Sequence, residues 1–156
     1  MIELEQMQRS IAKNSFASEN GMELVELTEE TALGRMKLEE RHMNIYHGMH
    51  GGCSYALADT IAGILIAART GHCVTTVDGH MNYLLPVADT EYVYCRAKIV
   101  RAGNRLAVIE AEISNDAGEN LCTASFTYYC TKAEFTLGRE SEEAADKKMK
   151  KYEKKC

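Results

Sequence analysis

Residues 51–68 read GGCSYALADTIAGILIAA, and this stretch decides the fold. Its apolar residues occupy every side of a helical wheel, so a helix formed here has to be enclosed by the rest of the protein. The apolar run from Cys53 to Ala68 is interrupted by Asp59 and is shorter than the ~20 residues that span a bilayer. We therefore expect a buried central helix rather than a membrane span.

The segments on both sides of this helix have the pattern of β-strands. Before it, residues 22–28 and 31–39 alternate imperfectly between apolar and polar side chains and predict a hairpin. After it, turn residues separate four further strand-like segments, at about 74–85, 91–101, 105–114 and 121–132. Together these predict an α+β fold in which one antiparallel sheet is wrapped around a long central α-helix.

The two ends of the chain differ from this middle part. Residues 2–13 predict a short amphipathic helix, and from residue 139 onward the sequence RESEEAADKKMKKYEKKC carries mixed charges at helical spacing. That spacing is typical of a solvated or frayed helix. We thus expect a single domain over residues 1–138, including the N-terminal helix, and a charged tail over residues 139–156.

Composition and charge exclude several classes of function. The net charge is −5 and the folded part has no long basic stripe, which argues against a general nucleic-acid-binding protein. The acidic start, residues 1–6, lacks the basic and apolar regions of a signal peptide. The six cysteines form no CxxC pair and lie mostly in apolar segments, as buried thiols of a reducing compartment do. We expect a cytoplasmic protein that contacts no membrane.

An acidic residue in the middle of an apolar helix needs either a partner or a function, because an unpaired buried carboxylate loses several kcal/mol of hydration. Asp59 could be a core acid satisfied by nearby donors, or a catalytic carboxylate. Gly51 and Gly52 expose backbone N–H groups at the positive end of the helix dipole, where an anion or a developing oxyanion can bind. A tight turn into the helix would explain the same two glycines.

Gly51 and Asp59 are eight residues apart, which is ~12 Å along a helix and too far for both to act on one carbonyl group in the same subunit. Either they do unrelated jobs, or two subunits share the site. If two copies pack their central helices antiparallel about a two-fold axis, Asp59 of one approaches Gly51 of the other. The partner would then cover an outer helix face that carries Ile61, Ile64 and Leu65. We expect a homodimer, or a dimer of dimers.

Three phrases of the sequence carry a resemblance. They are His50-Gly51-Gly52 with Asp59 nine positions after the histidine, DGHMNYLLP at residues 78–86, and RAGNRLAVIE at residues 101–110. Over roughly residues 21–132 the chain resembles the hotdog-fold thioesterases of the phenylacetic-acid-degradation type. The resemblance implies a hotdog fold and hydrolysis of an acyl-CoA thioester to a free acid and a thiol.

The resemblance also implies roles for single residues. The Gly51 N–H would polarise the thioester carbonyl group, and Asp59 of the partner subunit would attack it or activate water. Asn44 falls where such enzymes place an amide near the thioester, and His50 would mainly orient the loop. Some relatives have a serine or threonine one turn after the acid, where this chain has Gly63, so a water-positioning hydroxyl would come from elsewhere or be absent.

The remaining candidates concern binding of the substrate, of which coenzyme A is itself a part, so that we expect no separate cofactor. Arg101 and Arg105 bracket a hairpin turn and are either ordinary charged turn flanks or anchors for the phosphates of coenzyme A. The residues that we expect to bind substrate are Gly52, Asn82, Arg101, Gly103 and Arg105.

Other patterns carry less chemistry. The group His42, His47, His50 and Cys53 has no paired cysteine and no HExxH spacing, so we expect no metal site. The aromatic residues 126, 128 and 129 predict sheet packing rather than a platform for a ligand.

Two other functions remain open at this point. A hydratase or dehydratase acting on CoA-bound or carrier-bound acyl chains would pair a histidine, such as His50 or His80, with its acid. A non-catalytic acyl-CoA-binding regulator could use the same fold, because fold does not fix function.

Overall fold

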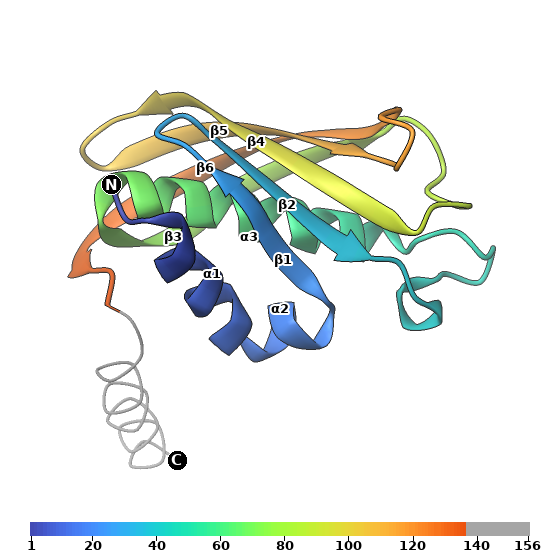
Figure 1. The fold of residues 1–156 in the computed structure, drawn as a ribbon. Helices are drawn as coiled ribbons and strands as arrows, with labels where there is room; N and C mark the ends of the chain where they lie inside the picture. Colours follow the sequence, from blue (N-terminus) through green and yellow to red (C-terminus); the bar gives the residue numbers. More distant parts are fainter. Residues whose placement is uncertain (137–156) are drawn as a thin grey trace, which may run out of the picture.

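The structure, a computed structural model, describes residues 1–136. Six strands form one antiparallel sheet in the order β1-β2-β4-β5-β6-β3, and the long helix α3 lies against it (Figure 1). The strands are β1 (Met22–Leu27), β2 (Thr31–Lys37), β3 (His72–Tyr83), β4 (Tyr92–Ala102), β5 (Leu106–Ser114) and β6 (Asn120–Glu134). The helices are α1 (Leu4–Lys13), α2 (Ser15–Glu19), the short 3-10 helix η1 (Glu40–His42) and α3 (Gly51–Thr70). This arrangement confirms the α+β fold that the sequence predicts.

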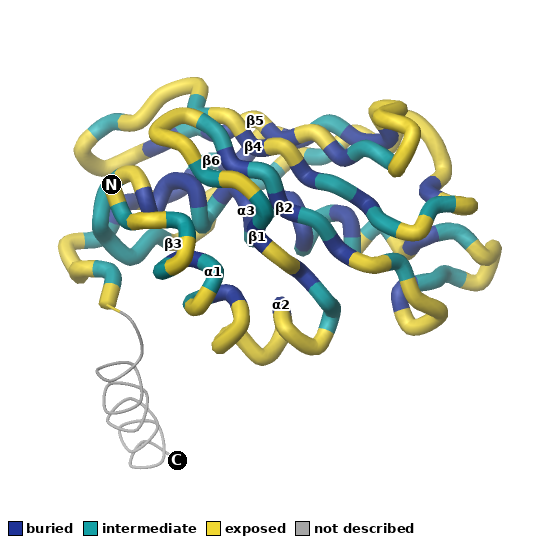
Figure 2. Tube along the Cα trace, in the orientation of Figure 1, coloured by how far each residue is buried: buried dark blue, intermediate teal, exposed yellow. Residues whose placement is uncertain are grey.

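Helix α3 is enclosed as its composition requires. All six strands pack against it, and its core side chains are buried (Figure 2). Each leucine or isoleucine so buried contributes about 1.5–3 kcal/mol. Strand β2 approaches so closely that a Cβ atom at Gly34 would overlap the side chain of Ile61. By length and composition α3 would also suit a membrane span, but its place inside the sheet accounts for its apolar character.

The N-terminal region contains more helix than the sequence predicts. Helix α1 buries Met7 and Ile11, and a second helix, α2, follows it directly. The side chain of Asn14 accepts the N–H of Ala17 at 3.1 Å and so caps α2. The predicted tail over residues 139–156 lies outside the described residues.

The prediction about the outer face of α3 is wrong for two of its three residues. Ile61 and Leu65 are both 0% exposed within a single subunit, so neither needs a partner to cover it. The half-buried side of α3 instead carries Asp59, Gly63 and Ile64, and it lies beside β3. Strand β3 is an edge strand, because it pairs only with β6.

Candidate active site

Asp59 lies in the middle of α3, and two hydroxyl groups hold its carboxylate. Tyr128 Oη donates to Oδ1 at 2.9 Å and also lies 2.7 Å from the backbone carbonyl oxygen of Asp59. Thr76 Oγ1 donates to the same Oδ1 at 2.9 Å. Within residues 1–136 no group donates to Oδ2. One oxygen of the carboxylate is therefore fixed and the other is free.

Tyr128 makes a hydrogen bond with Asp59 that the sequence did not reveal. Its side chain is 1% exposed and packs beside Phe126, as the prediction of sheet packing requires. Burial, and then the negative charge of Asp59, raise the pKa of the Tyr128 hydroxyl, which therefore stays protonated and acts as a donor. The available signal was that a buried tyrosine hydroxyl needs a polar partner, and Asp59 is the acid of the enclosed helix.

At the start of α3, His50 accepts hydrogen bonds from two of the first three backbone N–H groups of the helix. His50 Nδ1 accepts the N–H of Gly52 at 2.9 Å, and the His50 carbonyl oxygen accepts the N–H of Cys53 at 2.8 Å. No partner within residues 1–136 accepts the N–H of Gly51. His50 thus caps the helix, and of the two glycines Gly51 is the one that can offer its N–H to a ligand.

Two further side chains shape this end of the helix. Tyr83 Oη donates to the carbonyl oxygen of Gly51 at 2.9 Å, and a Cβ atom at Gly51 would lie 3.0 Å from the tyrosine ring. Asn44 Oδ1 accepts the N–H groups of Tyr46 and Gly48, at 2.8 and 3.2 Å. Asn44 Nδ2 makes only a long contact, 3.4 Å, with the carbonyl oxygen of Met49. The acceptor of Asn44 is thus used inside its own loop.

One subunit does not bring all the predicted residues together. Gly51 and Asp59 lie on the same straight run of helix, eight residues and ~12 Å apart. Asn82 lies on the other face of the sheet, because its neighbour Tyr83 points to α3 and side chains alternate along a strand. There Asn82 contacts Thr123 and His80, at 3.4 and 3.1 Å.

The predicted arginines flank the turn between β4 and β5. Arg101 and Arg105 are exposed, and among the described residues neither has an ion-pair partner. The N–H of Gly103 donates to the carbonyl oxygen of Leu106 at 2.9 Å and closes the turn. Residue 107, which follows this turn in β5, pairs with Tyr128, the residue that contacts Asp59. The turn therefore lies at the end of the sheet nearer to Tyr128.

A pocket of about 400 Å³ opens beside Asp59, between α1, α3 and β3. Apolar side chains such as Met7, Ile11 and Ile64 contribute to its lining, together with Asp59 and Thr76. The pocket therefore combines an apolar wall with a carboxylate. Within the described part of the chain, no group of three or more His, Cys, Asp and Glu side chains could hold a metal ion.

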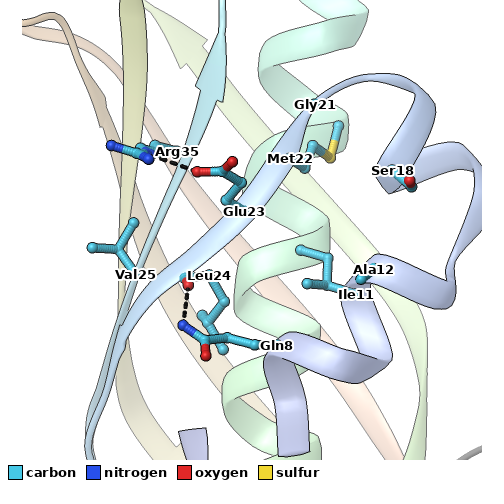
Figure 3. A pocket seen from close by; sticks show the side chains of 10 residues that line it. All are labelled: Gln8, Ile11, Ala12, Ser18, Gly21, Met22, Glu23, Leu24, Val25 and Arg35. Carbon is cyan, nitrogen blue, oxygen red and sulfur yellow. Dashed lines mark hydrogen bonds and ion pairs between the residues drawn. The ribbon is translucent and has the colours of Figure 1, made fainter. Parts of the chain in front are cut away.

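A larger hollow of about 540 Å³ lies on the β1 side of α1 (Figure 3). Three of its polar side chains are already paired: Gln8 Nε2 donates to the carbonyl oxygen of Leu24 at 3.0 Å, and Arg35 contacts Glu23 at 2.7 Å. Asp59 does not line this hollow. We therefore place the chemistry at the smaller pocket.

Comparison with known proteins decides the family. Residues 46–122 match the family model described as the thioesterase superfamily, and this range contains both Gly51 and Asp59. The chain belongs to the thioesterase superfamily. The acyl-coenzyme A thioesterase 13 of Mus musculus is 30% identical over 93 residues, which are 59% of this chain and 66% of that protein.

Solved structures of other thioesterases share the fold of this superfamily member. A thioesterase of Haemophilus influenzae is 25% identical, with a TM-score of 0.78 over 88% of this chain and 96% of that one. A Streptococcus pneumoniae protein, named a hypothetical thioesterase and crystallised with coenzyme A, is 22% identical, with a TM-score of 0.74 over 82% of this chain and 99% of that one. These likenesses confirm the predicted hotdog fold.

Proposed function

We propose that this protein is an acyl-CoA thioesterase, which hydrolyses a thioester to a free acid and the thiol of coenzyme A. The observation that carries the proposal is the carboxylate of Asp59, fixed at Oδ1 and free at Oδ2, on the same helix as the free N–H of Gly51. Membership of the thioesterase superfamily and the similarity to acyl-coenzyme A thioesterase 13 support it. The phenylacetic-acid-degradation type is the subgroup that we propose.

The chemistry needs a donor and a base on opposite sides of the thioester carbonyl group. The Gly51 N–H donates to the carbonyl oxygen and stabilises the oxyanion, a contribution of about 3 kcal/mol where such donors have been removed from other enzymes. Asp59 Oδ2 takes a proton from water, and the water oxygen attacks the carbonyl carbon. The C–S bond then breaks, and the sulfur takes a proton as it leaves. Direct attack by Asp59 would give the same products through an acyl intermediate.

The two groups meet only if two subunits share each site, so we propose a homodimer as the active unit. Gly51 and Asp59 are ~12 Å apart along one helix, a separation that antiparallel packing of two α3 helices would bridge. Strand β3, beside Asp59, is a free sheet edge that exposes Val77 to 60%. An exposed edge with an apolar side chain is a ready surface for a second copy.

A thiol-release assay tests the proposed reaction. Purified protein is offered short, long and aromatic acyl-CoA substrates, and release of the free thiol is expected with at least one class. Within one subunit neither candidate histidine of a hydratase is beside Asp59, because His50 Nδ1 caps the start of the helix and His80 lies on the other face of the sheet. Hydration of an enoyl-CoA without thiol release, or binding without turnover, would overturn the proposal.

The two exposed arginines are the proposed anchors for the phosphates of coenzyme A. Arg101→Ala or Arg105→Ala is expected to raise KM for acyl-CoA by roughly fivefold, since an exposed charged contact contributes about 1 kcal/mol. The value of kcat should change less, because a contact far from the carbonyl group binds the ground state and the transition state alike. Lys98→Ala, an exposed cation on the same strand as Arg101, is the matched control. Unchanged KM values would return both arginines to the role of turn flanks.

The pocket beside Asp59 is the proposed site of the acyl chain. Ser10 of α1 lines it, so Ser10→Trp is expected to fill the pocket without emptying the core. Displacing two methylene groups, at about 0.8 kcal/mol each, should lower kcat/KM for a long-chain acyl-CoA by roughly tenfold and leave acetyl-CoA unaffected. Arg9→Trp, the exposed neighbour, serves as control. An equal loss for both chain lengths would place the acyl chain elsewhere.

A further inference from the structure

Tyr128 contacts the same acidic residue at two atoms. Its single hydroxyl proton is shared between the backbone carbonyl oxygen of Asp59, at 2.7 Å, and Oδ1, at 2.9 Å. A donor that holds both the main chain and the carboxylate of one residue fixes the side-chain torsions between them. Thr76 adds a second donor to the same Oδ1. Both donors act on one oxygen, so the carboxylate is oriented as well as satisfied.

Gly63 of α3 lies next to the hydroxyl end of the Tyr128 side chain. A Cβ atom at residue 63 would lie 3.4 Å from Tyr128 Cε1 and 3.7 Å from Oη, so the side of residue 63 borders the phenol hydroxyl. Residue 63 also lies four positions after Asp59, on the same helix face. Glycine inside a helix is less favourable than alanine. The end of the Tyr128 side chain lies beside residue 63, at ordinary van der Waals distance from a Cβ atom placed there.

We propose that Tyr128 is a positioning residue for hydrolysis, and that its hydroxyl takes the place of a hydroxyl at position 63 and directs Oδ2 of Asp59 toward the reaction. The inference rests on the proposed thioesterase function. Two donors occupy Oδ1, and Oδ2 therefore keeps the lone pairs that receive the proton from water. That proton leaves with the sulfur when the C–S bond breaks. Tyr128 keeps its own proton throughout.

Tyr128→Phe removes the hydroxyl and keeps the buried ring. The variant is expected to lose about 10- to 100-fold in kcat, the range that follows from misplacing a reacting group by about 1 Å. KM should stay within about twofold, because the Tyr128 side chain is 1% exposed and does not line the pocket beside Asp59. Tyr129→Phe is the matched control on the same strand, since its side chain is exposed. A parental kcat in folded Tyr128→Phe would overturn the proposal.

A rescue experiment separates positioning from packing. In the Tyr128→Phe background, Gly63→Ser supplies a hydroxyl one turn after Asp59 and is expected to recover kcat by at least about fivefold, while Gly63→Ala recovers none. If Tyr128 only stabilises the core, serine and alanine at residue 63 will act alike, and the proposal fails. Asp59→Asn is measured in parallel: if it is active, the proposed function fails. An inactive Asp59→Asn beside a fully active Tyr128→Phe rejects this inference alone.

Discussion

Replacing Asp59 by asparagine is expected to abolish thioesterase turnover while leaving the fold and the proposed dimer intact. The loss in kcat should be at least ~100-fold, the least that removing a general base causes. The amide is nearly isosteric, and its oxygen can still accept from Thr76 and Tyr128, the two donors at Oδ1. Its nitrogen, however, would stand in place of Oδ2 and can neither attack a thioester nor accept a proton.

Three measurements on the parent and the variant test this prediction. They are the melting curve by circular dichroism, the elution volume in size exclusion, and kcat on the best acyl-CoA substrate of the thiol-release assay. If Asp59 were only a satisfied core acid, the variant would melt earlier and keep a comparable kcat in the folded fraction. A folded Asp59→Asn protein with near-parental kcat would remove Asp59 from the mechanism.

Gly51→Pro is expected to reduce kcat by about 100-fold, because proline lacks the N–H that we propose polarises the carbonyl group. Gly51 is the first helical residue, where proline is well tolerated, and His50 before it has φ −63° and ψ 130°, which suits the residue preceding a proline. Gly51→Ala is the control, since it keeps the N–H and brings a Cβ atom against Tyr83. Equal losses in both variants would mean that space, and not the N–H, is what position 51 supplies.

Mixing the two inactive variants tests the shared site directly. A dimer of one Asp59→Asn subunit and one Gly51→Pro subunit has one site with both groups intact and one with neither. Random exchange at equal concentrations makes half of the dimers mixed, so roughly a quarter of the parental activity should return. Sites complete within one subunit would give no recovery, and the shared-site geometry would then be wrong.

The main helix and the strands could be predicted from the sequence, because each of them has a local pattern of apolar and polar residues. The all-round apolar character of residues 53–68 requires an enclosed helix, and the alternation in residues 91–101 requires a strand with one buried face. Helix α2 was missed because five residues, Ser15–Glu19, give too short a period to recognise, and a single side chain caps them.

The sequence allows candidate site residues to be named where they lie close together along the chain, as His50, Gly51 and Asp59 do. Tyr128 could not be named in this way, because it is 69 residues from Asp59 and meets it only through the fold. Ile61 and Leu65 were assigned to an outer face because the wheel is apolar on every side and does not say which side the sheet covers. For Asn82, the alternation of side chains along β3 is informative. Tyr83 faces α3, so its neighbour Asn82 has to face the other side of the sheet.

The placement of Gly51 and Asp59 on one uninterrupted helix has a consequence for how this family member can change. In the proposed dimer this helix sets the distance between a donor that serves one site and a base that serves the other. A single residue inserted between positions 51 and 59 would turn Asp59 by about 100° around the helix axis and move it by about 1.5 Å along it. Both sites of the proposed dimer would be lost at once, because no loop lies between the two residues to absorb the change. Length variation should therefore be confined to the turns, and this stretch of α3 should keep a fixed number of residues.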